Sequence, residues 1–326
     1  MKNLVVGAVG AAAICACGTV AVRVPVMKPA EINMAGYQNV AIGEMTGNGN
    51  RLMTDSLEEA LVATGRFTVV DRQHIATVMR ELHLSSTDLA DPNAAAKLGK
   101  VVTAGALIFG DVQQTYRERP DENRYKDDKG VGHVFYLVKG EVYLRATFKI
   151  VDVATGRLIV AKTYEERRDD SNHATDKRPD PIDRIALDNA ARAGVVERFM
   201  KAIAPHQEFM YANFLKDSDI PQLEGGIGWA ERGDWKKAQA AFNEGAQEAE
   251  KNVKLKASQV AKCYWNLGLA YEYAGDFDKA EAMVSKAYSL SNEKEMLAEI
   301  DNIHRQQADA RRLAEQAPAP GLAGGK

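Results

Sequence analysis

Residues 67–112 constrain the fold more than any other part of the chain. Residues 67–70, FTVV, form a short β-branched and aromatic run, which is typical of a strand covered on both faces. Apolar residues at helical spacing follow at 75–82, and Asp91-Pro92 supplies the N-cap and first-turn proline of a second helix. Residues 106–110 are apolar again and predict another buried strand. The order strand, helix, helix, strand predicts a mixed α/β domain.

Three segments of this region and its continuation resemble a known family. They are FTVVDRQ at residues 67–73, LGK with AGALIFGDV between residues 98 and 112, and LRATFKIVDVATGRLI at residues 144–159. Together they are similar to the family of the curli-secretion lipoprotein CsgG, over about residues 39–205. The resemblance implies a mixed sheet flanked by helices, in the α/β (α+β) class. The matching segments are apolar strands and turns and contain no catalytic signature.

The composition is that of an ordinary globular chain with room for two domains. The chain has 326 residues, of which 45% are hydrophobic and 27% are charged, so it can bury sizeable cores. Its formal net charge is -3. Because nucleic acid is bound mainly through clustered positive charge, we do not expect nucleic acid as a partner.

The N-terminus has the pattern of a lipoprotein signal peptide. Lys2 gives a positive start, residues 4–14 form an apolar run too short to span a bilayer, and the run ends in Ile-Cys-Ala-Cys. This end resembles a bacterial lipobox and implies cleavage before Cys17, lipidation of Cys17 and anchoring to a membrane by several acyl chains. Gly18 follows the cysteine, which by the sorting rule of enteric lipoproteins implies the outer membrane and its periplasmic face. The alternative is an ordinary secretory peptide that is cut elsewhere.

The sequence divides into six segments. The region after Cys17 shows no clear period and contains Pro25 and Pro29, so we expect a tether. The predicted segments are a signal peptide (1–16), a tether (17–38), a CsgG-like α/β domain (39–207), a short strand-like link (208–218), a helical domain (219–315) and a flexible tail (316–326).

Two charged stretches bear on whether the chain forms a pore. In the curli channel the corresponding positions carry long membrane-spanning hairpins, which need strands of roughly 9 to 11 residues with apolar residues at every second position. Residues 113–132 and 165–180 are instead densely charged, and we expect polar loops there. Residues 133–146 alternate in part. The loops are interpreted as solvated surface, with a docking site as the alternative.

The C-terminal third contains two copies of one pattern, which resembles a tetratricopeptide repeat. Small residues let paired helices approach, aromatic residues fill the gaps between layers, and Gly-Asp makes the turn. The aligned residues are Gly226, Trp229, Gly233, Asp234, Trp235, Ala238 and Phe242 in the first copy, and Gly268, Tyr271, Gly275, Asp276, Phe277, Ala280 and Val284 in the second. A helix over residues 293–315 is expected to cap the all-α array.

In tetratricopeptide arrays the inner helices line a groove that binds partner proteins. By this resemblance, Lys262, Leu269, Glu272 and Tyr273 face the groove and bind a protein partner. The alternative is that so short an array packs only on its own chain.

No pattern in the sequence indicates catalysis, a metal or a cofactor. The six histidines are scattered, and no cysteine pair has metal-ligand spacing. A glycine turn at Gly47 and Gly49 imitates a dinucleotide-binding loop, but Leu52 stands where that loop needs a small residue. We therefore predict no metal, no cofactor and no enzyme activity, with an enzyme of unfamiliar site as the outlying alternative.

These observations predict an outer-membrane-anchored periplasmic lipoprotein that acts as a non-catalytic binding and scaffolding module in cell-envelope assembly or secretion. The alternative is a subunit of an oligomeric CsgG-type secretion pore that exports curli-like or other substrates. A homo-oligomer is compatible with both interpretations.

Overall fold

The computed structural model describes residues 18–70, 80, 83 and 105–317. The chain separates into two compact units, Met1–Lys28 with Gln207–Ala314 and Pro29–His206 with Glu315–Lys326. We call the first the helical unit and the second the sheet unit. The predicted signal peptide, Cys17 and the two helices expected between residues 75 and 104 lie outside the described residues, apart from isolated positions.

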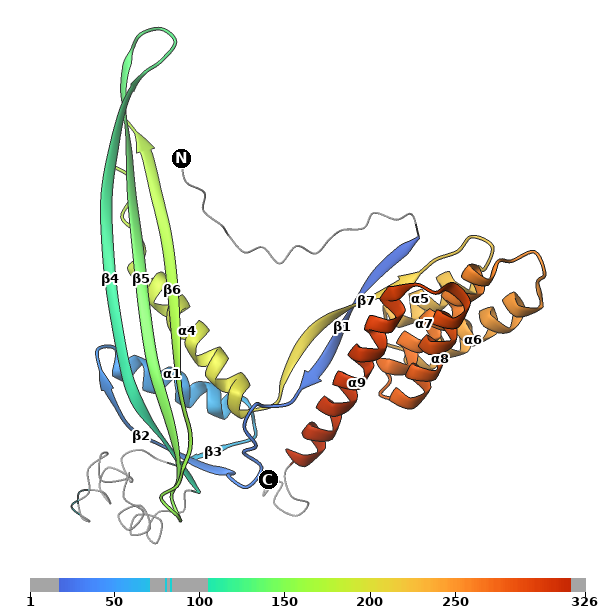
Figure 1. Ribbon diagram of the computed structural model, residues 1–326. Helices are drawn as coiled ribbons and strands as arrows, with labels where there is room; N and C mark the ends of the chain where they lie inside the picture. Colours follow the sequence, from blue (N-terminus) through green and yellow to red (C-terminus); the bar gives the residue numbers. More distant parts are fainter. Residues whose placement is uncertain (1–17, 71–79, 81–82, 84–104, 318–326) are drawn as a thin grey trace. The chain divides into compact units, whose positions relative to one another are not determined.

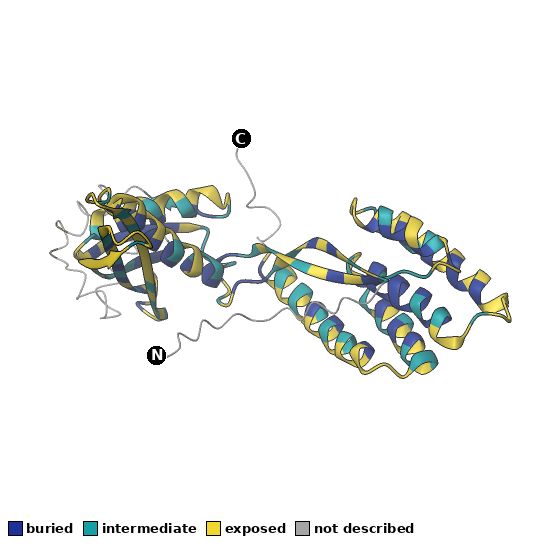
Figure 2. Cartoon of the chain, turned by 90° about the horizontal axis from the view of Figure 1, so that it is seen from above, coloured by how far each residue is buried: buried dark blue, intermediate teal, exposed yellow. Residues whose placement is uncertain are grey.

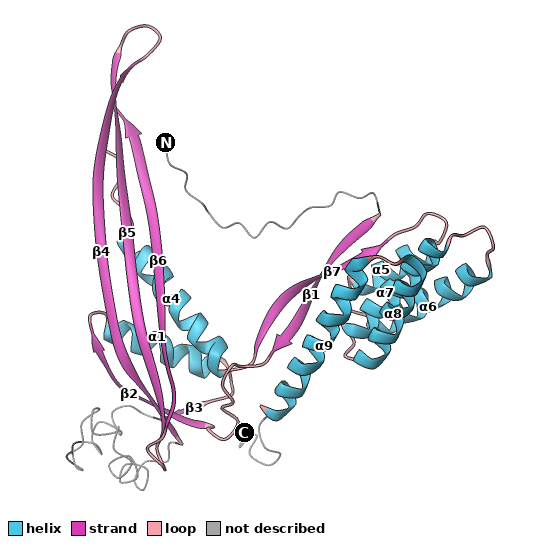
Figure 3. Ribbon diagram, viewed as in Figure 1, coloured by secondary structure: helices cyan, strands magenta, loops and turns pink. Residues whose placement is uncertain are grey.

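The sheet unit is built on one five-stranded mixed sheet, as Figure 3 shows in magenta. Its strand order is β3-β2-β4-β5-β6, with β2 parallel to β3 and β4 and the β4, β5 and β6 neighbours antiparallel. The mixed α/β fold predicted for this region is thus confirmed. The elements are β2 (Asn39–Gly47), α1 (Asn50–Ala63), β3 (Thr68–Val70), β4 (Ala106–Lys126), β5 (Gly132–Asp152), β6 (Leu158–Thr175) and α4 (Arg184–Ile203).

The core of the sheet unit lies between the sheet and the helices α1 and α4, which contact each other (Figure 1). Alternate residues of β5 point at α4, so Phe148 stacks on Phe199 with ring centroids 4.3 Å apart. The helix begins where the Asp183 side chain accepts a hydrogen bond from the backbone N–H of Ala186 at 3.0 Å.

Strands β4, β5 and β6 continue far past the end of β2 as a three-stranded ribbon. β2 pairs with β4 only as far as Val112, whereas the pairing of β4 with β5 runs on to Lys126 opposite Gly132. The prediction of loops at residues 113–132 and 165–180 is therefore wrong for most of both stretches. The outer residues of β4 and β6 are mostly exposed to solvent, which explains why these two strands are as charged as loops are.

Cross-strand charge pairs help to explain why these charged strands form. Glu141 lies opposite Arg117. On its other side Glu141 lies opposite Asp169, and the Arg167 guanidinium, 3.6 Å from the Glu141 carboxylate, offsets this like-charge pairing. Arg145 lies opposite Glu165, at 3.7 Å between the charged atoms. Opposite charges facing each other across strands stabilise pairing modestly, and the central strand β5 supplies the apolar residues.

The helical unit consists of a helical array and one pair of strands. Neighbouring helices α5 to α8 pack in sequence order, and buried positions line their facing sides (Figure 2). The helix predicted at residues 293–315 is present as α9. The elements are β1 (Thr19–Lys28), β7 (His206–Leu215), α5 (Gln222–Ala230), α6 (Trp235–Lys251), α7 (Ala257–Glu272), α8 (Phe277–Ser291) and α9 (Lys294–Glu315).

Two glycines of the repeated pattern let paired helices touch. A Cβ at Gly226 in α5 would overlap the ring of Phe242 in α6, and one at Gly268 in α7 would lie 2.5 Å from Val284 in α8. In both helix pairs, a glycine of the first helix thus lies against a large side chain of the second helix, at equivalent positions of the repeated pattern. The sequence comparison between the two copies predicted this equivalence.

Strand β1 occupies the segment for which we expected an irregular tether. Val20, Val22, Val24 and Val26 alternate along it, and Val22 and Val24 are each only 4% exposed. They pack in one core with Phe214 of β7. The period of two was present in the sequence, but the interspersed Pro25 obscured it.

Candidate functional site

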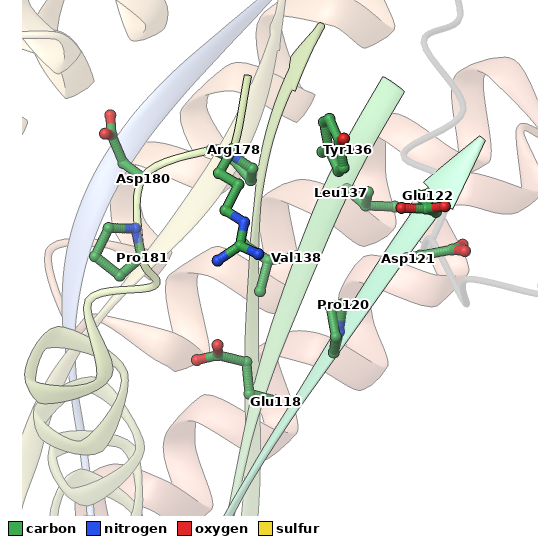
Figure 4. Close-up of a pocket in the computed structure, with 11 residues that line it drawn as sticks. Glu118, Pro120, Asp121, Glu122, Tyr136, Leu137, Val138, Arg178, Asp180 and Pro181 are labelled. Carbon is green, nitrogen blue, oxygen red and sulfur yellow. The ribbon is translucent and has the colours of Figure 1, made fainter. Parts of the chain in front are cut away.

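A groove runs along one face of the three-stranded ribbon. Pro120 of β4 lies opposite Val138 of β5, and Glu122 lies opposite Tyr136, so these four residues share a face. They form the apolar floor and one edge of a cavity of about 600 Å³. In Figure 4 Pro120, Asp121 and Glu122 of β4 stand on one side of this cavity and Pro181 on the other.

The second wall is the segment that returns from the end of β6 toward α4. The Asn172 side chain donates hydrogen bonds to the backbone oxygens of Asp180 and Pro181, both at 3.1 Å. Ile182 then packs over Gly140, where a Cβ would lie 2.7 Å from an Ile182 methyl carbon. A larger residue than glycine at position 140 would push this wall off the sheet.

A histidine–aspartate pair fixes the start of that segment. His133 Nδ1 lies 2.6 Å from Asp176 Oδ2, and the backbone N–H of Val134 donates to Asp176 Oδ1 at 2.8 Å. The hydrogen bond to Asp176 raises the pKa of His133 above its usual value, and partial desolvation opposes this. The raised pKa favours the protonated imidazolium, whose charge strengthens the hydrogen bond to the Asp176 carboxylate.

The groove carries an excess of negative charge. Four carboxylates, those of Glu118, Asp121, Glu122 and Asp180, line it together with the guanidinium of Arg178. Apolar floor and acidic rim together suit an extended, positively charged polypeptide segment. Sequence analysis placed these residues in solvated loops, and the partial alternation at residues 133–146 was the signal that they belong to a ribbon.

One of the four carboxylates is oriented by a neighbour on the same strand. Tyr116 donates its hydroxyl proton to Glu118 at 2.6 Å, and this hydrogen bond raises the pKa of Tyr116 to about 12. This hydrogen bond fixes the Glu118 carboxylate beside the Tyr116 hydroxyl, on the face of β4 that both side chains share.

The four residues predicted to bind a partner lie on or next to α7. Lys262 pairs with Asp217 at 2.9 Å. Leu269 and Glu272 are each 1% exposed, and Tyr273 stacks on Trp235 with ring centroids 5.7 Å apart. Their contacts within the described residues are thus with their own chain. Partner binding by these residues stays a prediction.

The chain's own strand β7 lies against α7. The side chain of Asn266 accepts from the backbone N–H of Leu215 and donates to its carbonyl oxygen, each at 2.8 Å. The Trp265 indole donates to the backbone oxygen of Asn213 at 2.8 Å. These side chains bind the extended backbone of β7 through the same kind of hydrogen bonds that would bind a peptide. This arrangement is the one expected if the helical array packs only on its own chain.

Within residues 18–70 and 105–317, no three histidine, cysteine, aspartate or glutamate side chains come together in a way that could hold a metal ion. Cys263 is buried, and desolvation raises the pKa of its thiol to about 12. None of the helices in the described part of the chain has the length and hydropathy needed to cross a bilayer.

The family comparison covers the sheet unit. Residues 30–176 match the model of the family described as curli production assembly/transport component CsgG. This range runs from just after β1 to the end of β6, so the resemblance found in the sequence is confirmed for this part of the chain.

Solved structures of several bacterial lipoproteins are similar over part of the chain. The LpoB C-terminal domain from Salmonella enterica is 16% identical, with 39% of this chain and 81% of that chain covered and a TM-score of 0.25. Lipoprotein GNA1162 from Neisseria meningitidis is 12% identical, with 49% and 96% covered and a TM-score of 0.27. A minor lipoprotein from Acinetobacter baumannii is 10% identical, with 51% and 91% covered and a TM-score of 0.25. No curated protein matches the chain.

Proposed function

We propose that this protein is a cell-envelope lipoprotein that acts as a non-catalytic binding and scaffolding module in envelope assembly or secretion. The acidic groove on the ribbon carries the proposal, because it offers an apolar floor, a charged rim and a fixed second wall to a protein segment. The match of residues 30–176 to the CsgG family supports a role in the envelope.

Anchoring is proposed to occur through Cys17, at the periplasmic face of the outer membrane. The support is the signal-peptide pattern of residues 1–17, which is followed after Gly18 by strand β1. Metabolic labelling with a palmitate analogue tests this. The unaltered protein should incorporate label and sediment with the outer membrane, and Cys17→Ala should do neither. Label on Cys17→Ala would overturn the assignment.

The groove is proposed to bind a basic, extended segment of a protein partner. The helical unit, which resembles a tetratricopeptide array, is proposed to support a further protein contact. A photoreactive amino acid in place of Tyr136 should cross-link in cells to one protein, through a segment rich in lysine or arginine.

Charge reversal gives the control for that cross-link. Glu122→Lys with Asp180→Lys should abolish the adduct, because the rim then repels a basic segment. Asp128→Lys, in the turn between β4 and β5, should leave it unchanged. An adduct that survives the double reversal, or that forms through an acidic segment, contradicts the proposed groove function.

A subunit of an oligomeric secretion pore is the second candidate. The lengths of β4, β5 and β6, at 21, 21 and 18 residues, favour it because roughly 9 to 11 residues suffice to cross hydrocarbon. The charged side chains on the outer parts of β4 and β6 speak against it, since each costs a few kcal/mol at mid-bilayer, about 2–4 for Arg or Lys. Light scattering on Cys17→Ala protein separates the candidates: a soluble monomer or small oligomer supports the scaffold, and a membrane-bound ring supports the pore.

A further inference from the structure

The pair of strands in the helical unit has one face buried and one face open to solvent. β1 and β7 form a two-stranded sheet (Figure 1). The even-numbered residues Val22, Val24 and Phe214 lie in the core of the helical unit. The odd-numbered residues at positions 19–27 and 207–213 are all exposed. We call these odd-numbered residues the outer face, which is separate from the groove on the ribbon.

Large apolar side chains are gathered on the outer face. Met27 and Phe209 are each 49% exposed, and Tyr211 is 66% exposed. Apolar side chains that are grouped in this way on a small surface mark a contact with another molecule or with a membrane. Tyrosine in particular has an apolar ring and a polar hydroxyl group, which suits the boundary between water and lipid.

The charge of the outer face is positive. Its one charged residue is Arg23, and none of its nine residues is an aspartate or a glutamate, although the chain has 45 of these. The Arg23 guanidinium stacks on Phe209, with Cζ 3.5 Å from the ring centroid, and pairs with no carboxylate in the described part of the chain. Its N–H groups are therefore available to a phosphate, which arginine binds through two parallel hydrogen bonds.

The proposed lipid anchor is attached at the start of the outer face. Cys17 precedes Gly18, whose backbone oxygen accepts a hydrogen bond from the backbone N–H of Lys216. Because consecutive Cα atoms are about 3.8 Å apart, Cys17 lies within about 8 Å of Thr19, the first residue of the outer face. Acyl chains on Cys17 would therefore bring this face to the lipid surface.

We propose that the outer face of β1 and β7 docks on the surface of the membrane that holds the anchor. Met27, Phe209 and Tyr211 then lie among the lipid headgroups, and Arg23 donates to a lipid phosphate. Burial of apolar side chains and attraction to anionic lipid act together in such contacts. An anchor alone leaves the helical unit free to rotate about it, whereas docking fixes the unit with α7 turned away from the lipid. This orientation rests on the proposed anchoring through Cys17.

Photo-cross-linking to lipid tests the docking. The full chain, purified from cells with a benzophenone amino acid in place of Tyr211, is mixed with vesicles of phosphatidylglycerol and phosphatidylethanolamine. Illumination should add the mass of a phospholipid to the peptide that contains position 211. The same amino acid in place of Glu244, on the exposed side of α6, is the control position. It should give severalfold less lipid adduct, because α6 packs on α5 and α7 and not on the strands.

Arg23→Gln tests the contribution of the charge. It keeps an exposed polar side chain and should lower the lipid adduct at position 211 by up to about fivefold, since one arginine contributes about that much near an anionic surface. Lys236→Gln, which removes an exposed positive charge from α6, should leave the adduct unchanged.

The mass of the N-terminal peptide shows in the same samples whether Cys17 is acylated. A lipid adduct on a chain that is not acylated supports the outer face and contradicts the anchor. An acylated chain without a lipid adduct at position 211 overturns the docking and retains the anchor, and a chain with neither modification contradicts both. Equal lipid adducts at positions 211 and 244 also overturn the docking, as does an adduct of position 211 with a protein, a second copy of this chain included.

Discussion

Two adjacent glycines in α5 differ in what surrounds them. A Cβ at Gly225 meets nothing within 4 Å, whereas one at Gly226 runs into Phe242. Gly226→Ala should lower the free energy of unfolding by about 1–3 kcal/mol through overpacking. Gly225→Ala should raise it by about 0.5–1 kcal/mol, because alanine restricts the unfolded chain and favours helix. Urea denaturation of both variants checks the pair.

The opposite order of stabilities, or equal values for the two variants, would show that α5 and α6 are not in contact at Gly226. The comparison is internal, since both substitutions add the same methyl group to the same helix.

The buried carboxyl group of Glu272 should make the free energy of unfolding depend on pH. With a folded-state pKa of about 9 against an ordinary value of 4.5, the unfolded chain ionises at this residue over a range in which the folded chain stays protonated. The unfolded state then binds fewer protons, so the stability contribution present below pH 4.5 is lost progressively as pH rises to 9.

Relative to Glu272→Gln, the unaltered chain should lose stability between pH 5 and 8 with a slope approaching about 1.4 kcal/mol per pH unit. Urea denaturation at several pH values measures the difference, with Glu244→Gln as the control that should follow the unaltered chain. Parallel pH profiles for the unaltered chain and Glu272→Gln would mean that Glu272 is ionised in the folded protein.

At the scale of residues, the sequence predicts a feature well when residues close in the sequence determine it. The Gly-Asp turns and the paired glycines Gly226 and Gly268 follow from neighbours in the same repeat. The environment of Glu272 does not, because it depends on Gln306 and Asn302, which are some thirty residues further along in α9.

Elements with an apolar pattern were predicted well, among them β3 and the first part of β4. The outer parts of β4 and β6 were not, because strands exposed on both faces need no apolar alternation and are held by pairing with β5. The candidate groove was missed with them. Strand β1 was missed although its valines alternate, since two prolines nearby suggested an irregular segment.

The register of the ribbon can be tested by cross-linking. Arg119 of β4 lies opposite Lys139 of β5, and both are exposed. Arg119→Cys with Lys139→Cys should form a disulfide readily, because directly opposite Cβ atoms are about 4.5–5.5 Å apart. Arg119→Cys with Arg145→Cys, six positions further along β5, should not, since about 20 Å then separates the pair.

The experiment uses a chain in which Cys15 and Cys17 are alanine, and Cys263 is buried and unreactive. Mass spectrometry under mild oxidation detects the bond. Equal cross-linking of both pairs would indicate a mobile loop in place of paired strands.

At the scale of the whole molecule, each unit has a hydrophobic core of its own. Phe199 belongs to the core of the sheet unit and Phe242 to that of the helical unit. Calorimetry should therefore show two unfolding transitions. Phe199→Ala should lower the midpoint of one and Phe242→Ala that of the other, each by an amount equivalent to about 3–5 kcal/mol. A single transition moved by both variants would contradict separate cores.

The general class of the molecule could be predicted from its sequence, since apolar strands and the resemblance to CsgG define the sheet unit. What binds to it could not, because the groove combines residues of β4, of β5 and of the segment that follows β6. The geometry of the groove depends on contacts between segments that are distant in the sequence.

Strand β1 has a mechanical consequence for the N-terminal anchor proposed at Cys17. A strand rises about 3.2–3.4 Å per residue, which is close to the greatest reach of a chain. The covalent backbone of β1 therefore carries any tension applied between Gly18 and Pro29, because the strand is already close to its greatest length. An irregular tether with the same number of residues would first extend under tension, and only then would it transmit the full force. With that anchor, a pull at Gly18 would reach Pro29 through ten residues of β1, and the chain of α5 to α9 would lie outside the path of the load.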